Sequence, residues 1–436
     1  MRILVVSLEC WNEQNNGGNV LSNIFDGFND SEFAQIYLSS GLPENKICEN
    51  YFQMTDGMAI QNIFHKKSMG KILTKNTIKS TEIKIDNQIT SIKRKKNSEL
   101  LRILRQIVWH MSDYKNENLK KFILDFKPDI IFAPCYGNTY MLSLTRYIAC
   151  ITNKPIISYI SDDFYSLKQV RLSPFYWINK IIVRHSLKKT WRLYSLIYTM
   201  TTSQLNLMNS LGKPMKILRK SGEFNLQVLS KRINSPIRLI YAGGVYLNRH
   251  KTLECIANAI RELNVADKKF RLDIYTNNEL NSNAKKILND QENSFLHSSI
   301  PFAELTEEYQ KSDIALHVES FDLKNRLNVR MSFSTKIIDC LDSGCAVMAV
   351  CDKKQAGFQY LKEENTAICV DSPKKIKPIL DELSKNPEII AKYRARAIDC
   401  GKKNHLKENI DKEIKKDFEG IVYNYEYSTN KCSRSN

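Results

Sequence analysis

The sequence lacks the features that mark a membrane-spanning or secreted protein. No apolar run among its 436 residues approaches the roughly 18 residues of a transmembrane helix. The N-terminal apolar run from Ile3 to Val6 is too short for a signal peptide, and the charged Glu9 follows it closely. The run instead predicts a first buried strand, and we expect the protein to stay in the cytoplasm.

Patterns that bind metal ions are also missing. The 11 cysteines include no Cys-x-x-Cys pair and the 7 histidines no His-x-x-x-His pair, which argues against a zinc site. No Asp-x-Asp pair occurs, so a bound diphosphate would have to be neutralised by helix N–H groups and cations. We therefore expect no metal and no other cofactor, and we expect free thiols in a reducing compartment.

The charge of the chain is strongly unbalanced. Lys and Arg number 65 against 47 Asp and Glu, a formal net charge of +18. A basic surface attracts nucleic acid, anionic lipid or a polyanionic substrate, and the charge alone does not choose among them. The sequence has no RNP aromatic pattern and no zinc finger, so we expect no nucleic-acid partner.

Strand-like apolar runs alternate with helical patterns over nearly the whole chain. Most are continuous rather than alternating, as in parallel strands that are covered on both faces. The expected strands are Ile3–Ser7, Phe33–Leu38, Ile130–Ala133, Pro155–Ile160, Leu196–Thr201, Ile237–Ala242, Arg271–Tyr275, Ile314–Val318, Ala346–Val350 and Thr366–Val370. The pattern predicts an α/β fold with doubly wound parallel sheets.

The pattern occurs twice, which predicts two Rossmann-like domains that face a cleft. We expect a first domain over residues 1–205, with a polar insertion at about 66–100, and a connection over 206–236. A second domain would span 237–402, followed by a C-terminal helix and a polar tail over 403–436. The C-terminal helix is expected to cross back to the first domain.

A hydroxyl-rich loop and a short helix in the second half are typical of a phosphate site. Ser334 and Thr335 are residue types that begin helices, and the first turn of a helix offers free N–H groups to an anion. Lys336 adds a cation at this end. Asp339 lies one turn further on the same face, where its carboxylate suits ribose hydroxyls. Together they predict a nucleoside diphosphate site; an ordinary surface helix is the alternative.

Two strand ends in the same half support this interpretation. Gly243 and Gly244 end an expected strand and permit close approach of a ligand to the backbone. Arg249 and Lys251 follow and are candidates for binding phosphate oxygens. Glu319 ends another strand, where it is a candidate catalytic acid that accepts hydrogen bonds from sugar hydroxyls, or a solvated loop acid.

In the first half, two short motifs follow expected strands. Gly17 and Gly18 form an expected turn before a helix over Asn19–Phe25 and are candidates for the acceptor side. Asp162 and Asp163 follow the strand Pro155–Ile160 and are candidates for catalysis, either as a base or by binding an acceptor hydroxyl. The alternative for the two aspartates is a helix N-cap.

The segment 173–196 predicts a membrane-facing helix. Cations recur at every fourth position and two tryptophans border them, which is typical of contact with an anionic bilayer. Four cations at about 1 kcal/mol each would give weak, reversible attachment. Phe175, Ile178 and Ile182 are expected to face the core. The predicted contact residues are Trp177, Lys180, Arg184, Lys188, Trp191 and Arg192; the alternative is a solvated face with the tryptophans packed inside.

These residues together resemble the nucleotide-sugar-dependent glycosyltransferases of the GT-B fold, close to glycosyltransferase family 4. The matching segments are Phe126–Phe132, Tyr241–Lys251 and Ser334–Gly344. The resemblance implies that Arg249 and Lys251 bind the donor diphosphate and that Asp339 holds the ribose. One departure is that the two acidic residues of the family lie closer together than Glu319 and Asp339 do.

The resemblance implies a sugar transferase of bacterial cell-surface polysaccharide synthesis. It would take a nucleotide-sugar donor and a glycan or lipid-linked acceptor at the inner membrane face, without a metal and with retention of configuration. A nucleotide-sugar epimerase of the same fold and a basic nucleic-acid-binding protein are the alternatives.

Overall fold

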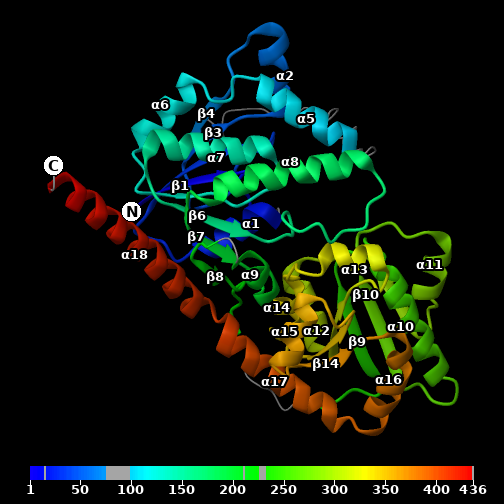
Figure 1. Ribbon diagram of the computed structural model, residues 1–436. Helices are drawn as coiled ribbons and strands as arrows, with labels where there is room; N and C mark the ends of the chain where they lie inside the picture. Colours follow the sequence, from blue (N-terminus) through cyan, green and yellow to red (C-terminus); the bar gives the residue numbers. More distant parts are fainter. Residues whose placement is uncertain (14–15, 75–98, 210–211, 225–231, 435–436) are drawn as a thin grey trace.

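The computed structural model describes residues 1–13, 16–74, 99–209, 212–224 and 232–434, and it contains two parallel sheets (Figure 1). Most of the expected insertion at 66–100 lies outside the described residues. The first half contains β1 (Arg2–Ser7), α1 (Asn16–Phe25), β2 (Glu32–Tyr37), β3 (Asn50–Gln53), α2 (Asp56–His65), β4 (Lys71–Thr74), α5 (Glu99–Met111), α6 (Glu117–Phe126), β5 (Ile130–Phe132), α7 (Thr139–Thr152), β6 (Ile156–Ile160), α8 (Pro174–Trp191), β7 (Tyr194–Thr199), α9 (Thr202–Asn209) and β8 (Met215–Ile217).

The first sheet has eight strands in the order β4-β3-β2-β1-β5-β6-β7-β8. All neighbours are parallel except β3 and β4. In the central strand β1, Ile3 lies beside Phe33 of β2 and Ile130 of β5. The strand is buried on both faces, which explains why its sequence is a continuous apolar run rather than an alternating one.

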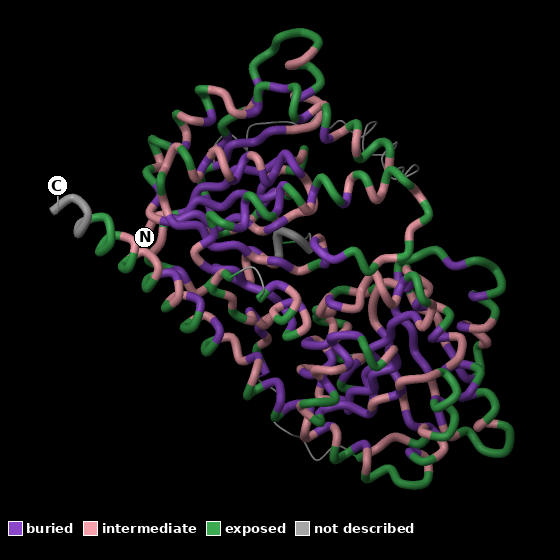
Figure 2. The backbone as a smooth tube through the Cα atoms, viewed as in Figure 1, coloured by how far each residue is buried: buried purple, intermediate pink, exposed green. Residues whose placement is uncertain are grey.

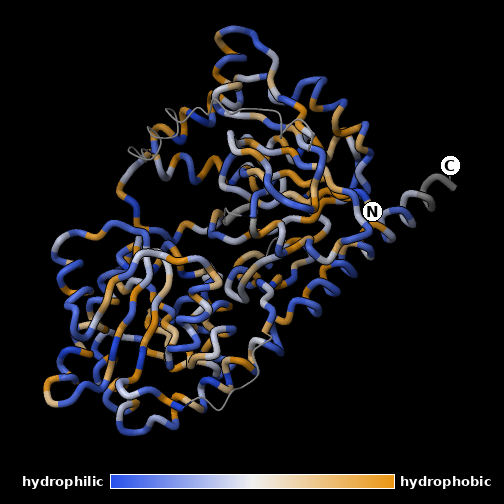
Figure 3. Tube along the Cα trace, turned by 180° about the vertical axis from the view of Figure 1, so that it is seen from behind, coloured by the Kyte–Doolittle hydropathy of each residue, from blue (hydrophilic) through white to orange (hydrophobic). Residues whose placement is uncertain are grey.

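The second sheet has six parallel strands in the order β11-β10-β9-β12-β13-β14. Buried residues form the centre of each sheet, and orange hydrophobic stretches follow the strands (Figures 2 and 3). The second half contains β9 (Ile237–Ala242), α10 (Arg249–Leu263), β10 (Phe270–Tyr275), α11 (Ser282–Leu288), β11 (Ser294–His297), α12 (Phe302–Gln310), β12 (Ile314–Val318), α13 (Leu323–Val329), α14 (Lys336–Leu341), β13 (Ala346–Val350), α15 (Ala356–Glu363), β14 (Ala367–Val370), the 3-10 helix η1 (Pro373–Lys375), α16 (Ile376–Lys385), α17 (Glu388–His405) and α18 (Lys407–Arg434).

The direction of strand order reverses once in each sheet. In the first sheet the reversal lies between β1 and β5, and in the second it lies between β9 and β12. At such a point the connections leave to opposite sides and open a crevice at the carboxyl ends of the strands. These two reversals therefore fix where each half of the molecule can bind a ligand.

The C-terminal helix α18 crosses back to the first half of the chain, as expected, and runs along its outside in Figure 1. Phe418 is fully buried and packs edge-on against Phe25, with ring centroids 5.8 Å apart. Asp417 accepts a hydrogen bond of 2.8 Å from the Tyr198 hydroxyl. The end of the chain thereby completes the core of the domain in which the chain begins.

The predicted α/β class with doubly wound parallel sheets is confirmed. The strands β9, β12 and β13 occupy the residues that the sequence predicted. Four strands were missed: β3, β4, β8 and β11. Since β8 pairs with β7 in the first sheet, that sheet extends past residue 205, where the sequence predicted the first domain to end.

Candidate active site

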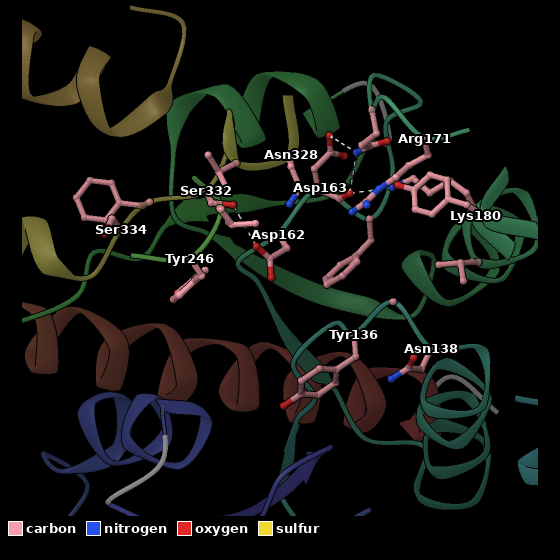
Figure 4. Close-up of a pocket in the computed structure, with 18 of the residues that line it drawn as sticks. Tyr136, Asn138, Asp162, Asp163, Arg171, Lys180, Tyr246, Asn328, Ser332 and Ser334 are labelled. Carbon is pink, nitrogen blue, oxygen red and sulfur yellow. Dashed lines mark hydrogen bonds between the residues drawn. The ribbon is translucent and has the colours of Figure 1, made fainter. Parts of the chain in front are cut away.

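A cleft of about 960 Å³ lies between the two halves of the molecule and receives residues from both strand reversals. Tyr136 and Asn138 enter it from the loop after β5, and Tyr246 and Ser332 come from the second half (Figure 4). Among the described residues, no group of three or more His, Cys, Asp or Glu side chains is placed to hold a metal ion. The cleft is lined by cations, carboxylates and hydroxyls from both halves.

The turn after β9 brings the backbone close to a lysine from α14. Gly243 has φ +139°, and a Cβ atom at this position would lie 1.9 Å from Nζ of Lys336. Only glycine avoids both the strained conformation and this overlap. The Tyr241 hydroxyl donates a hydrogen bond of 2.7 Å to the Gly244 carbonyl oxygen and fixes the turn. The predicted close approach at the two glycines is thus an approach to Lys336.

Arg249 and Glu319 form a buried, bidentate ion pair across the second reversal. Nε and Nη2 of Arg249 donate to the two Glu319 carboxylate oxygens at 2.8 and 2.7 Å, and both side chains are less than a tenth exposed. Burial acts to lower the pKa of Arg249, but its hydrogen bonds to Glu319 outweigh burial and raise it. The carboxylate of Glu319 is directed at Arg249, whose guanidinium it holds at the cleft wall.

Lys336 is a half-buried cation in the second half of the chain and lines the cleft. Its Nζ lies 5.0 Å from the centre of the Tyr241 ring and 3.4 Å from the Tyr241 hydroxyl. Burial, and then the charge of Arg249, lower the pKa of Lys336 to about 8. None of the ion pairs between described residues includes Lys336. The ammonium is therefore charged at neutral pH, confined, and open to an anionic ligand.

The predicted helix start is correct in place but different in detail. Helix α14 begins at Lys336, yet Thr335 makes no side-chain capping bond. Instead Ser334, Thr335 and Asp339 line the cleft together with Lys336. An oxygen of Asp339 also accepts from Nζ of Lys220 at 3.3 Å. Because it makes no capping bond, the Thr335 hydroxyl is available to a ligand in the cleft.

Lys251, in contrast, is exposed on α10 and lies outside the cleft. The sequence placed it with Arg249 as a basic pair. Because α10 begins at Arg249, the two residues lie two positions apart on one helix and point in different directions. The structure thus brings together Arg249 and Lys336 and leaves Lys251 in solvent.

His317 is a cleft residue that the sequence analysis missed. It lies in β12 two residues before Glu319, so both side chains point to the same face of the strand. It is 4% exposed, and burial lowers its pKa to about 4, so it is neutral at pH 7. A histidine within the otherwise apolar strand Ile314–Val318 was the available signal.

Asp162 and Asp163 both line the cleft but have different surroundings. Asp163 accepts from the Ser166 backbone N–H at 2.7 Å and from Nη2 of Arg330 at 2.6 Å. Burial alone would raise the pKa of Asp163, but these bonds and charges lower it, which makes it a weak base. The Asp162 carboxylate accepts a hydrogen bond of 3.1 Å from the Ser332 hydroxyl and, among the described residues, forms no ion pair.

Arg330 and Ser332 come from the second half of the chain, so these bonds join the two sides of the cleft. The Thr201 hydroxyl adds a hydrogen bond of 3.0 Å to the Met331 carbonyl oxygen. We call Asp163, Arg330, Ser332 and Thr201 the interdomain clasp. Arg330 was not predicted, because nothing in its local sequence indicates a partner more than 160 residues away.

Helix α8 faces the opposite way from the prediction. Trp191 is buried in the core. Lys180 is also buried, and its ammonium donates a hydrogen bond of 2.8 Å to the Asp163 carbonyl oxygen. The guanidinium of Arg184 lies 4.3 Å from the centre of the Tyr165 ring. Only Lys188 and Arg192 of the predicted cations are exposed. The Trp177 indole N–H donates to the Arg171 carbonyl oxygen at 3.0 Å.

The expectation that Phe175, Ile178 and Ile182 face the core is wrong. These three side chains are 47%, 50% and 49% exposed. The cationic stripe was expected to face outward against an anionic bilayer, but the loop after β6 supplies partners for Lys180 and Arg184 on the inside. The described helices include none with the length and hydrophobicity needed to cross a bilayer.

The glycines predicted for the acceptor side also lie elsewhere in the secondary structure. Helix α1 begins at Asn16, so Gly17 and Gly18 belong to its first turn rather than to a turn before it. The first half of the chain lines the cleft in part through α5 and α8 instead. The residues that these helices contribute are Glu99, Arg102, Arg105, Gln106, Tyr176, Asn179, Lys180 and Val183.

The fold has known counterparts, although no protein-family model and no curated protein sequence matches the chain. Sucrose-phosphate synthase from Thermosynechococcus elongatus superimposes with a TM-score of 0.63 at 10% identity, over 97% of this chain and 99% of that one. Alr3699/HepE from Anabaena in complex with UDP gives 0.61 at 12% identity, over 96% and 100%.

A third structure, described as "Trehalose-6-phosphate from E. coli bound with UDP-2-fluoro glucose", gives 0.61 at 11% identity over 97% and 99% of the two chains. Each match spans both sheets and the cleft between them. The chain has the GT-B fold. In GT-B terms, the second sheet with α10 and α14 is the C-terminal domain, and the first sheet with α5 and α8 is the N-terminal domain.

Proposed function

We propose that the protein is a glycosyltransferase that takes its sugar from a nucleotide-sugar. The observation that carries the proposal is the meeting of Arg249, Lys336 and Asp339 at the second strand reversal. Two cations and a carboxylate one helical turn away fit a diphosphate and a ribose. The similar structures from Anabaena and E. coli bind UDP and a UDP-sugar analogue, which supports the same donor class here.

In this proposal the C-terminal domain stabilises the leaving diphosphate. Lys336 and Arg249 would bind its oxygens, since charge that develops on the leaving group is stabilised most by donors already in place. Glu319 positions Arg249 rather than attacking the sugar. Asp339 would exchange its contact with Lys220 for the ribose hydroxyls. We propose that the reaction needs no metal and, on the resemblance to family 4 alone, that it retains the anomeric configuration.

The N-terminal domain would bind the acceptor. Of the two neighbouring aspartates, Asp162 has fewer hydrogen-bond partners than Asp163. Asp162 is therefore our candidate for binding the acceptor hydroxyl. Arg171 lines the same half and forms no ion pair with any described carboxylate; its guanidinium lies 5.4 Å from the centre of the Tyr176 ring. This cation favours an acceptor with a phosphate group, such as a lipid-linked glycan or a sugar phosphate.

Thermal-shift and calorimetric titration with UDP, GDP and ADP tests the donor site. We expect at least one nucleoside diphosphate to stabilise the protein, and we expect Lys336→Ala to reduce its affinity while Lys251→Ala does not. Release of the nucleotide from the sugar donor should then depend on an added acceptor, which separates a transferase from an epimerase. If no nucleotide binds, or if both lysine variants behave alike, the proposed donor site is wrong.

A further inference from the structure

Helix α5 has an inverted amphipathic pattern. Its polar side chains at Glu99, Arg102 and Gln106 face the cleft. On the opposite side, Leu104 and Ile107 are 46% and 47% exposed. A surface helix of a globular protein normally buries its apolar face, so the orientation of α5 needs a reason. The cleft explains why the polar side chains of α5 face inward, but it does not explain why the apolar side chains are exposed.

Helix α8 repeats the inversion beside α5, to which it is linked by a hydrogen bond from Gln106 to Asn179. Asn179 and Lys180 face the cleft, whereas Ile178 and Ile181 are 50% and 60% exposed. In the loop before α8, Leu172 is 98% exposed. We call Leu104, Ile107, Leu172, Phe175, Ile178 and Ile181 the apolar surface.

An apolar surface of this kind is unusual on a soluble monomer. It is not scattered exposure, because it combines the outward faces of two adjacent helices and a loop. It also borders the acceptor half of the cleft, since the same two helices line that half with their inner faces. A partner that covers the apolar surface would therefore lie at the entrance for the acceptor.

The charges around the apolar surface indicate the kind of partner. Helix α8 contains no Asp or Glu, and its exposed face continues from Ile181 to Lys188 and Lys189 at the C-terminal end. In α5 the single acid is Glu99, and its side chain faces the cleft. Apolar side chains bordered by cations match the interface of an anionic bilayer, where the acyl boundary lies beneath acidic headgroups.

We propose that the apolar surface docks on an anionic bilayer, which presents a lipid-linked acceptor to the part of the cleft that α5 and α8 line. The acceptor part of this inference rests on the proposed transferase function, whereas the docking does not. The basic stripe predicted from the sequence is not the contact: Lys180 and Arg184 face inward, and the aliphatic side chains beside them face outward.

Vesicles of phosphatidylglycerol and phosphatidylcholine test the docking by sedimentation, with phosphatidylcholine vesicles as comparison. Trp177 is a built-in probe, because it lies on α8 while Trp11, Trp109 and Trp191 are fully buried. We expect co-sedimentation with the anionic vesicles, quenching of tryptophan fluorescence when the phosphatidylcholine is brominated, and weaker binding at high salt.

The variant Ile178→Ser/Ile181→Ser should reduce partitioning by roughly a hundredfold, since each buried aliphatic side chain contributes about a factor of ten. The matched control is Val265→Ser/Phe302→Ser, which changes side chains that are 84% and 72% exposed on the C-terminal domain. It should bind vesicles like the unchanged protein. Neither variant should alter nucleotide-induced stabilisation.

Three results would overturn the proposal. The protein could stay in the supernatant with anionic vesicles at low salt, or the control variant could lose as much binding as Ile178→Ser/Ile181→Ser. Alternatively, light scattering could show that the unchanged protein is a dimer and that Ile178→Ser/Ile181→Ser is a monomer. In that case a second copy of the chain covers the apolar surface. Vesicle binding without nucleotide binding would instead reject the transferase and leave the docking intact.

Discussion

The two halves of the cleft are built in different ways. In the C-terminal half, ligand-facing groups come from the ends of neighbouring strands and the helices that directly follow them, as with Arg249 at the start of α10. In the N-terminal half, the loops after β5 and β6 contribute as well, but two long helices, α5 and α8, add side chains from their faces. A site at strand ends can be located from local sequence, whereas a site on helix faces depends on how each helix is rotated.

The largest effect that would test this contrast is expected at the Arg249–Glu319 pair. Glu319→Ala leaves a buried guanidinium without its partner, and we expect the free energy of unfolding to fall by about 3–5 kcal/mol in urea titrations. Replacing both residues, as in Arg249→Met/Glu319→Leu, should recover most of the stability but not nucleotide binding. A single variant as stable as the unchanged protein would contradict the buried pair.

The next largest effect concerns the two lysines that the sequence treated alike. Lys336→Ala should weaken binding of a nucleoside diphosphate by about 2 kcal/mol, roughly thirtyfold, because a charged hydrogen bond is lost. Lys251→Ala, at an exposed position on α10, should change it by less than about twofold, as expected of a surface substitution. Calorimetry on both variants measures the difference, and equal losses would place the diphosphate elsewhere.

The interdomain clasp tests whether the two halves act together. Arg330→Ala removes the 2.6 Å contact to Asp163 and should lower kcat/KM by about tenfold, since one charged hydrogen bond across the cleft is lost. Donor affinity should stay the same, because Arg330 lies outside the proposed diphosphate site. The control is Arg326→Ala, whose partner Asp352 belongs to the same domain. Equal activity in both variants would show that the clasp has no role.

The pH dependence of donor binding should show an effect of similar size. The pKa of Lys336 is lowered to about 8, and a bound diphosphate raises it because it favours the charged form. Affinity is therefore greatest below pH 8 and should fall by about tenfold between pH 7 and pH 9. Lys336→Arg should remove this fall, since arginine stays charged. A flat profile in the unchanged protein would exclude Lys336 as the binding cation.

The sequence located the strands of the sheet centres better than those of the edges. The strands β12 and β13 are buried along their whole length, so their apolar runs leave little choice of structure. In the missed strand β4 only Leu73 is buried, and β8 is three residues long and has no buried residue. Such strands are held by their neighbours, and their own composition carries little signal.

The candidate site shows the same division between residues that a local pattern predicts and residues that only long-range contacts bring together. Gly243, Lys336 and Asp339 were predicted from local pattern, and the structure places all three at one end of the second sheet. The mutual pairing of Arg249 and Glu319 was not predicted, because the residues lie 70 positions apart. The sequence treated them as two separate ligands, one for phosphate and one for sugar.

The sequence by itself determined the two parallel sheets and the segments that line the C-terminal half of the cleft, because the hydrophobic periodicity and the turn glycines act within a few residues. Only the tertiary structure decided the partners of Asp163 and the rotation of α8. A helix with apolar and basic faces can bury either one when the surroundings supply ligands for its cations. Here Asp163 and Tyr165 supply them, so Lys180 and Arg184 face inward and the apolar surface faces out.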